Sequence, residues 1–202
     1  MLNLGWFSKG PCEKSIKQLA RQEYNSKNYS KAEKALLELK NIAKDQSWAN
    51  DVLARLYMNT KRHGEAIPLL QENLQASNDQ EREINYLIDC YRITIETLRQ
   101  IGEYEEASEY FDKGYNQFPS SKKILISGIK LKWDLGDMVS VKTLSSILLQ
   151  QDQHDDAAIK FNLQSLIKLG NLKELKKSIY SILKSNPNNI DTYNIAIDFA
   201  LE

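Results

Sequence analysis

The chain has 202 residues, with 27 Lys and Arg against 27 Asp and Glu and no net formal charge at pH 7. This balance counts against a dedicated nucleic-acid binder, whose affinity depends on surplus cations that contact phosphates. Hydrophobic residues make up 42% of the chain, enough to bury a core, while eight Gly and four Pro are too few for the closely spaced turns of a β-sandwich or barrel. We therefore expect a folded, mainly helical protein.

Residues 1–12 form a lead segment that opens on a short apolar run, Met1 to Phe7. The run lacks the basic start and the long apolar stretch of a signal peptide. No other stretch is apolar for long enough to cross a membrane as a helix. Two cysteines, Cys12 and Cys90, cannot staple a small secreted domain and do not have metal-site spacing. These features favour a soluble, cytoplasmic protein without a cofactor or a metal.

Five interruptions of the helical pattern divide the rest of the chain into similar stretches. They are Lys27-Asn28, Lys61-Arg62, Ile101-Gly102, Leu135-Gly136 and Leu169-Gly170. Each precedes an apolar helix with a small or branched residue near its start, and these residues are 34, 41, 34 and 34 positions apart: Ala32, Ala66, Ala107, Val141 and Leu175. A fixed period of this length is typical of stacked helix pairs.

Each period contains two amphipathic helices whose apolar residues follow three-and-four spacing. The second period shows both faces: Val52, Leu53, Leu56 and Tyr57, then Ala66, Ile67, Leu70 and Leu74. The longer third period contains residues 79–100, which have no helix breaker and predict one helix of about 22 residues, ~33 Å long. Ile84 and Leu87 lie on its apolar overhang, which either packs on its own chain or forms a self-association surface.

Signals for helix ends agree with this division. Capping boxes are predicted where Ser30 precedes Glu33 and where Asn171 precedes Glu174, because the first side chain can accept a hydrogen bond from the third N–H of a new helix. Ser120 is placed at the start of another helix for the same reason.

The stretch 98–111, LRQIGEYEEASEYF, which closes at Pro119, resembles a tetratricopeptide (TPR) repeat. That family's unit is a helix–turn–helix of 34 residues with Gly and an aromatic residue at the turn and a small residue early in the second helix. The resemblance covers residues 13–202 and implies an all-α, right-handed superhelical solenoid. Its expected units are 13–46, 47–80, 81–121, 122–155 and 156–189, followed by a terminal helix at 190–202.

The resemblance also implies a non-catalytic scaffold or adaptor that binds a peptide or helix of a partner protein in a concave groove lined by the first helices. By the family's helix geometry, the groove residues are Lys17, Arg21, Tyr24, Trp48, Arg55, Arg92, Arg99, Lys130 and Trp133. Cations outnumber acids on this face, which suits an acidic partner, and the tryptophans suit binding hot spots. The alternative is that the cations only solvate the inner wall while the tryptophans pack between units.

Other classes of function stay open at this point. No catalytic pair is recognisable, since His63 and His154 are far apart in the chain and neither cysteine has a neighbouring histidine. However, the chain could be the N-terminal recognition region of a larger enzyme such as a glycosyltransferase, with catalysis beyond residue 202, because the terminal helix has no second helix. An RNA-binding helical-repeat protein is disfavoured by the neutral charge. A homodimer is also left open.

Overall fold

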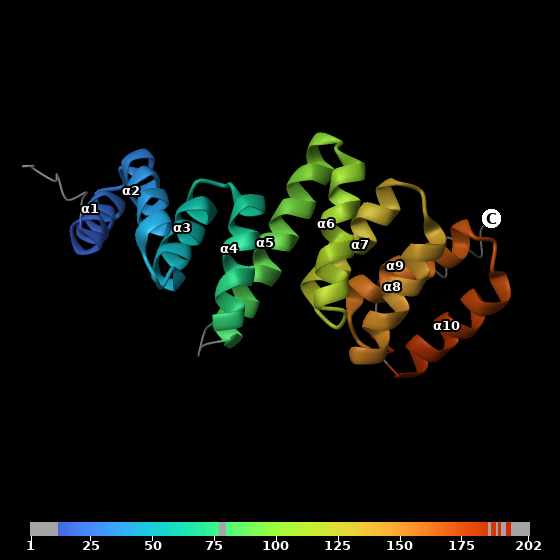
Figure 1. Ribbon diagram of the computed structural model, residues 1–202. Helices are drawn as coiled ribbons and strands as arrows, with labels where there is room; N and C mark the ends of the chain where they lie inside the picture. Colours follow the sequence, from blue (N-terminus) through green and yellow to red (C-terminus); the bar gives the residue numbers. More distant parts are fainter. Residues whose placement is uncertain (1–11, 77–79, 186, 189, 191–192, 195–202) are drawn as a thin grey trace, which may run out of the picture. The chain divides into compact units, whose positions relative to one another are not determined.

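The computed structural model describes residues 12–76, 80–185, 187–188, 190 and 193–194. Within these ranges the regular structure is entirely α-helical (Figure 1). The helices are α1 (Glu13–Asn25), α2 (Tyr29–Ile42), α3 (Ser47–Asn59), α4 (His63–Ala76), α5 (Gln80–Ile101), α6 (Tyr104–Gln117), α7 (Lys122–Asp134), α8 (Met138–Gln151), α9 (Asp156–Lys168) and α10 (Leu172–Ser185). The all-α prediction is confirmed. The apolar lead and most of the expected terminal helix lie outside the described residues.

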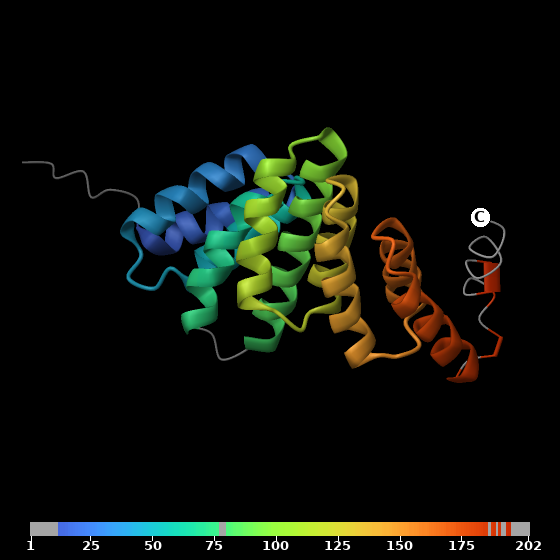
Figure 2. The ribbon, with the colours of Figure 1, turned by 90° about the vertical axis from the view of Figure 1, so that its right-hand side faces the viewer.

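The chain divides into two compact units, Met1–Cys90 and Tyr91–Glu202, and the boundary falls inside α5. In the first unit, α1 packs on α2, α2 on α3, and α3 on α4. In the second unit, α6 packs on α7, and the succession continues through α8 and α9 to α10 (Figures 1 and 2). Sequential antiparallel helix pairs are therefore the building block of each unit. The boundaries of the individual repeats stay a prediction.

One residue in the left-handed conformation ends each first helix, at the five interruptions found in the sequence. These residues have φ between 59° and 86°: Lys27, Lys61, Gly102, Gly136 and Gly170. The N–H of the next residue then donates to the carbonyl five positions back, as from Asp137 to Lys132 at 2.9 Å. This conformation costs a residue with a Cβ ~1–2 kcal/mol. The turns therefore favour glycine, and the two lysines carry backbone strain.

We predict opposite effects of substitution at two of these equivalent turns. Gly136→Ala should lower the free energy of unfolding by about 1 kcal/mol, because a Cβ there meets no atom within 4 Å and the cost is purely conformational. Lys61→Gly should raise it by up to about 1 kcal/mol, because it relieves the same strain. Chemical denaturation measures both. A loss of stability in both variants would contradict this account of the turns.

The helices pack closely at the small or branched residues that recur near the start of each second helix. All five have no exposed surface: Ala32, Ala66, Ala107, Val141 and Leu175. Successive pairs also approach closely, since a Cβ at Gly128 in α7 would lie 2.1 Å from the Phe111 ring in α6. The core therefore depends on close contact between helices at fixed positions of the repeat.

The predicted capping box at Ser30 is wrong. Helix α2 begins at Tyr29, with Asn28 at the capping position, so Ser30 already lies inside the helix. The Glu33 carboxylate instead accepts two hydrogen bonds from the Arg62 guanidinium, at 2.8 and 3.0 Å. A charge-assisted bidentate contact to the next helix pair is stronger than a local cap, and it takes the carboxylate away from its own helix end.

The other predicted helix starts fit better. Asn171 caps α10: its side-chain oxygen accepts from the Glu174 N–H at 3.4 Å, and its amide donates to the Glu174 carboxylate at 2.6 Å. Helix α7 begins after Ser121 rather than after Ser120, a displacement of one residue, and the Ser121 side chain forms no capping hydrogen bond. An unforeseen feature is Pro68 inside α4. It has no N–H to offer the carbonyl four residues before it.

Asp155 joins two successive helix pairs of the second unit. It caps α9 by accepting from the Ala158 N–H at 2.8 Å, and it pairs with Lys122 at the start of α7. Burial alone would raise the pKa of Asp155, but the hydrogen bonds from Lys122 and Ala158 outweigh it and hold the pKa below its ordinary value. A carboxyl whose pKa is lowered by folding stabilises the protein above the unfolded pKa, near 4, and this stability is lost as the pH falls through the folded pKa.

Asp155→Asn should therefore reduce stability near neutral pH by about 1 kcal/mol, because the cap oxygen remains but the charge is lost. The variant should also lose less stability than the parent between about pH 5 and pH 2. Thermal unfolding across this pH range measures both effects, with Glu38→Gln on the exposed side of α2 as the control. An acid response in Asp155→Asn equal to that of the parent would contradict the prediction.

Candidate partner-binding surface

The first unit brings three predicted groove residues together around Trp48. Lys17 and Arg21 are one helical turn apart on α1, so both project from the same face. The Lys17 ammonium lies 4.7 Å from the centroid of the Trp48 ring, and the Arg21 guanidinium carbon lies 5.8 Å from it. Both contacts are cation–π interactions, which hold the two cations in place without neutralising them.

The cations on this face of α1 are largely free of acid partners. Within the described part of the chain, neither Lys14 nor Arg21 forms an ion pair or a side-chain hydrogen bond. Lys17 helps to lower the pKa of Asp45, although hydrogen bonds with Ser47 contribute more. An open hollow of about 410 Å³ is lined by Lys14, Lys17, Gln18 and Arg21. The face therefore offers exposed positive charge beside an aromatic ring.

Two other predicted groove residues of the first unit have partners in the chain. The Arg55 guanidinium donates to Asp51, one turn earlier on α3, so its charge is balanced locally. The Tyr24 hydroxyl accepts a hydrogen bond from the Asn59 side chain at 3.0 Å, and its ring packs edge-on against Tyr29. Both residues lie on first helices as expected, but their polar groups are already engaged.

In the second unit the predicted cations form an ion-pair network. Arg99 pairs with Glu96 at 3.1 Å and with Asp134 at 2.6 Å, and Lys130 pairs with Glu96 at 3.2 Å. Ser127 also donates to Glu96, at 3.4 Å. Burial acts to lower the pKa of Arg99, but the hydrogen bonds to Asp134 and Glu96 outweigh it and raise the pKa. With its side chain only 20% exposed, Arg99 is a structural cation.

The remaining predicted residues are also partly covered. Trp133 packs edge-on against Phe161, and Lys168 lies over its ring at 5.5 Å. Arg92 is half-buried. On the long helix α5, which has the predicted 22 residues, Ile84 is half-buried and Leu87 is fully buried in its own chain. Leu87 therefore offers no surface to a second copy, which weakens the case for self-association through the overhang.

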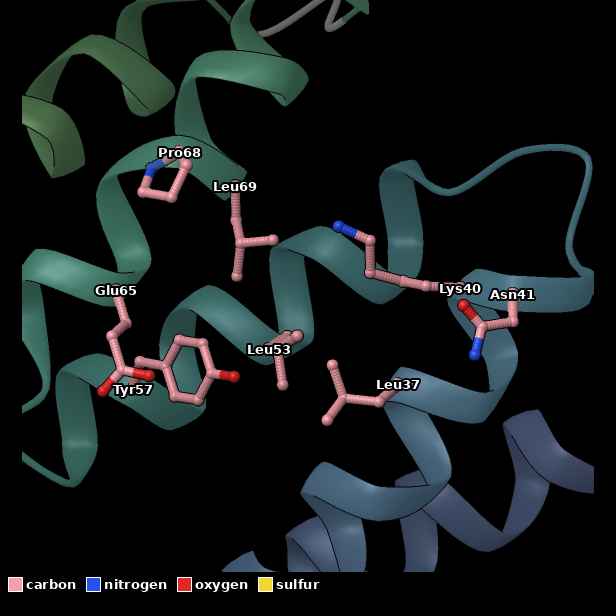
Figure 3. Close-up of a pocket in the computed structure, with 8 residues that line it drawn as sticks. All are labelled: Leu37, Lys40, Asn41, Leu53, Tyr57, Glu65, Pro68 and Leu69. Atoms are coloured by element: carbon pink, nitrogen blue, oxygen red, sulfur yellow. The ribbon is translucent and has the colours of Figure 1, made fainter.

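A second hollow in the first unit was not found from the sequence. It lies among α2, α3 and α4 and has a volume of about 430 Å³. Figure 3 shows the residues that line it: Leu37, Lys40, Asn41, Leu53, Tyr57, Glu65, Pro68 and Leu69. Leu37 is 44% exposed, whereas Leu53 at the base is buried. The sequence gives little sign of this hollow, because its lining comes from three helices and most of its apolar residues look like ordinary core.

Two other kinds of site are absent from the described ranges. No helix there is long and apolar enough to cross a membrane. No group of three or more His, Cys, Asp or Glu side chains in those ranges could hold a metal ion.

Comparison with solved structures identifies the arrangement of these helices. YrrB, described as a TPR protein with an unusual peptide-binding site, matches with a TM-score of 0.52 at 10% identity, over 91% of each chain. A tetratricopeptide repeat protein from Parabacteroides merdae matches with a TM-score of 0.51 at 13% identity, over 92% of this chain and 71% of that one. The chain has the tetratricopeptide-repeat fold. No protein-family model matches the sequence, and no curated protein does so either.

The TPR fold accounts for the position of the predicted groove residues. All nine lie on the first helices of helix pairs, namely α1, α3, α5 and α7. Their environments differ, because Arg55, Arg99 and Lys130 pair with acids, whereas Lys17 and Arg21 of α1 stack on Trp48. That the groove binds a partner stays a prediction, and α1 with Trp48 is the part best equipped for it.

The two thiols of this TPR chain should react very differently. Cys12 is exposed, whereas Cys90 is fully buried, and burial raises its pKa to about 12. Since the thiolate is the reactive form, we expect a thiol reagent to label Cys12 alone in the folded protein and both cysteines after denaturation. Mass spectrometry of the labelled peptides gives the answer. Rapid labelling of Cys90 under native conditions would show that the middle of α5 opens easily.

Proposed function

We propose that this protein is a non-catalytic scaffold or adaptor that binds an acidic peptide or helix of a partner protein at the Trp48 surface, which consists of Lys14, Lys17, Arg21 and Trp48. The observation that carries the proposal is the difference between this surface and the rest of the predicted groove. Here an arginine and two lysines have no ion-pair partner among the described residues, whereas Arg55 and Arg99 have carboxylates beside them.

Free cations contribute more to binding than paired ones. A ligand carboxylate that approaches Arg99 must compete with Glu96 and Asp134, so part of its attraction is lost against the existing ion pairs. Arg21 has no competing carboxylate among the described residues, and its guanidinium is already oriented by the Trp48 ring. Covering the ring with an apolar side chain of the partner would remove further surface from water.

The nature of the fold supports the class of function. TPR proteins of known structure generally mediate protein–protein interactions, and YrrB is described by its peptide-binding site. The likeness is at the level of the fold, so the partner of this chain has to be inferred from its own residues. Both cysteines are free, which supports the reducing cytoplasm as the location of the protein.

A peptide array tests the proposal without a known partner. We expect short synthetic peptides that combine Asp or Glu with an apolar residue to bind the chain, and their Lys-substituted counterparts not to bind. Lys17→Glu with Arg21→Glu should weaken the tightest peptide at least roughly tenfold, and Trp48→Ala should do so too. Fluorescence anisotropy measures the affinity, and circular dichroism checks that each variant remains folded.

Two further variants make the test specific. Lys31→Glu with Lys34→Glu on α2 reverses two exposed cations outside the Trp48 surface and should leave binding unchanged. Leu37→Glu alters the hollow of Figure 3 and should also have no effect. If Leu37→Glu abolishes binding while the Lys17 and Arg21 reversals do not, the partner binds in the hollow and the proposal is wrong.

A further inference from the structure

The second helices of the second unit carry a graded charge at equivalent positions. Figure 1 shows α6, α8 and α10 following one another along this unit. Positions 34 residues apart in the three helices correspond to each other in the repeat. They hold Glu105, Ser108, Glu109, Asp112 and Asn116 on α6; Val139, Lys142, Thr143, Ser146 and Gln150 on α8; and Lys173, Lys176, Lys177, Tyr180 and Lys184 on α10. The series therefore passes from acidic to nearly neutral to basic.

Most of these positions lie on the outer side of their helices, although Ser146 accepts a hydrogen bond from Asn162 of α9 at 3.0 Å. All of them are exposed except Ser108, Lys142 and Ser146, which are half-buried. We call this set of positions the second-helix face. Because the fully buried residues of α6, α8 and α10 occupy other positions, substitutions on this face leave the core intact.

The acidic strip on α6 keeps most of its charge. The helix contains four carboxylates and one lysine. That lysine, Lys113, lies 3.7 Å from Glu109 and over the ring of Tyr110, so it balances part of one carboxylate. Glu105 and Asp112 form no ion pair within the described residues. The strip therefore repels anionic ligands such as nucleic acid or acidic lipid.

The basic strip on α10 has no acid partner among the described residues. The helix has four lysines and a single acid, Glu174, which is occupied by Lys142 at 2.6 Å and by Asn171 at 2.6 Å. None of the four lysine side chains forms an ion pair or hydrogen bond in the part of the chain that the structure describes. Tyr180 lies among them with 71% of its surface exposed.

The apolar side of α10 is already used. Leu175 is buried in a cluster with residues of α9, and Ile179 and Ile182 pack against that cluster. A helix that inserts into a membrane surface needs its apolar side free. The side of α10 that remains accessible is therefore the charged one, and it suits a protein surface of opposite charge better than a lipid interface.

The α8 strip between them is nearly neutral. Its one cation, Lys142, is balanced by Glu174, and its exposed residues include Val139 at 63%. Such a strip neither attracts nor repels an identical copy of itself, and Val139 offers apolar surface for contact.

We propose that the second-helix face is a self-association surface whose partner is a second copy of this chain. Consider a two-fold axis that runs parallel to α8 and lies between the two copies. Rotation about this axis places the acidic strip of each copy against the basic strip of the other. It also brings the two α8 strips together. A two-fold interface requires one patch that is complementary to itself, and this face has both charges in the required order. An unrelated anionic partner would meet α10 favourably but would be repelled by α6.

Charge reversal with complementation tests this proposal. In sedimentation velocity at low salt the full chain should dimerise, and raising the salt from about 50 mM to about 500 mM should weaken the dimer at least tenfold, because the contacts are solvent-exposed charges. Variant A, Lys173→Glu with Lys176→Glu and Lys177→Glu, should be monomeric. Variant B, Glu105→Lys with Glu109→Lys and Asp112→Lys, should also be monomeric.

Mixing separates a specific interface from a general charge effect. Variants A and B in equal amounts should form a heterodimer, since each carries the charge that the other lacks, and a chain with all six reversals should dimerise with itself. Lys31→Glu with Lys34→Glu on α2, in the first unit, should sediment like the parent. Circular dichroism confirms that the variants are folded. This experiment does not involve the Trp48 surface, so its outcome is independent of the peptide array.

Three results would overturn the proposal. The first is a parent chain that remains monomeric at low salt and high concentration. The second is a dimer that variants A and B leave intact, which would place the contact elsewhere. The third is failure of A and B to associate with each other although both are folded. Binding of a monomeric parent to vesicles rich in phosphatidylserine, lost in variant A, would instead assign the lysines of α10 to a membrane surface.

Discussion

The close approach of helices at one repeated position is the constraint on which this structure depends. The residue at that position is small or branched and has no exposed surface in any of the five helix pairs: Ala32, Ala66, Ala107, Val141 and Leu175. A left-handed residue at the preceding turn reverses the chain so that the second helix reaches this contact. Each pair then leaves an apolar flank that the neighbouring pair covers, which explains why the core extends through successive pairs within each unit.

Polar contacts between neighbouring pairs follow the same period. Glu33 and Arg62 are 29 residues apart, Lys142 and Glu174 are 32 apart, and Arg99 and Asp134 are 35 apart. These spacings are close to one repeat, so an acid on one pair meets a cation on the next. Stacking therefore neutralises inner cations such as Arg99 and Lys130. The cations of α1 and α10 have no acid partner among the described residues, and both proposed surfaces use them.

The two proposed surfaces would work together in a scaffold. The Trp48 surface belongs to the first unit and the second-helix face to the second, so occupation of one does not use residues of the other. A dimer would carry two Trp48 surfaces. A partner with two acidic segments could then bind both, and the second contact would be strengthened by the high effective concentration that the first creates. Self-association would in this way raise avidity without changing the chemistry of the individual site.

The fold of this protein was largely determined by patterns that are local in the sequence. The period of 34, the five turns and the length of α5 all follow from the spacing of apolar residues and helix breakers, because these set which side of each helix is buried. The nine groove residues could likewise be assigned to first helices. The sequence could not tell which of their charges are available.

Only the tertiary structure decided that question. Arg21 and Arg99 look alike in the helical pattern, yet one stacks on Trp48 and the other is held by Glu96 and Asp134. Glu33 left its predicted capping box for the same kind of reason. An ion pair forms wherever folding brings two opposite charges within a few ångströms. That distance depends on how successive helix pairs stack, which the residues of a single helix do not specify.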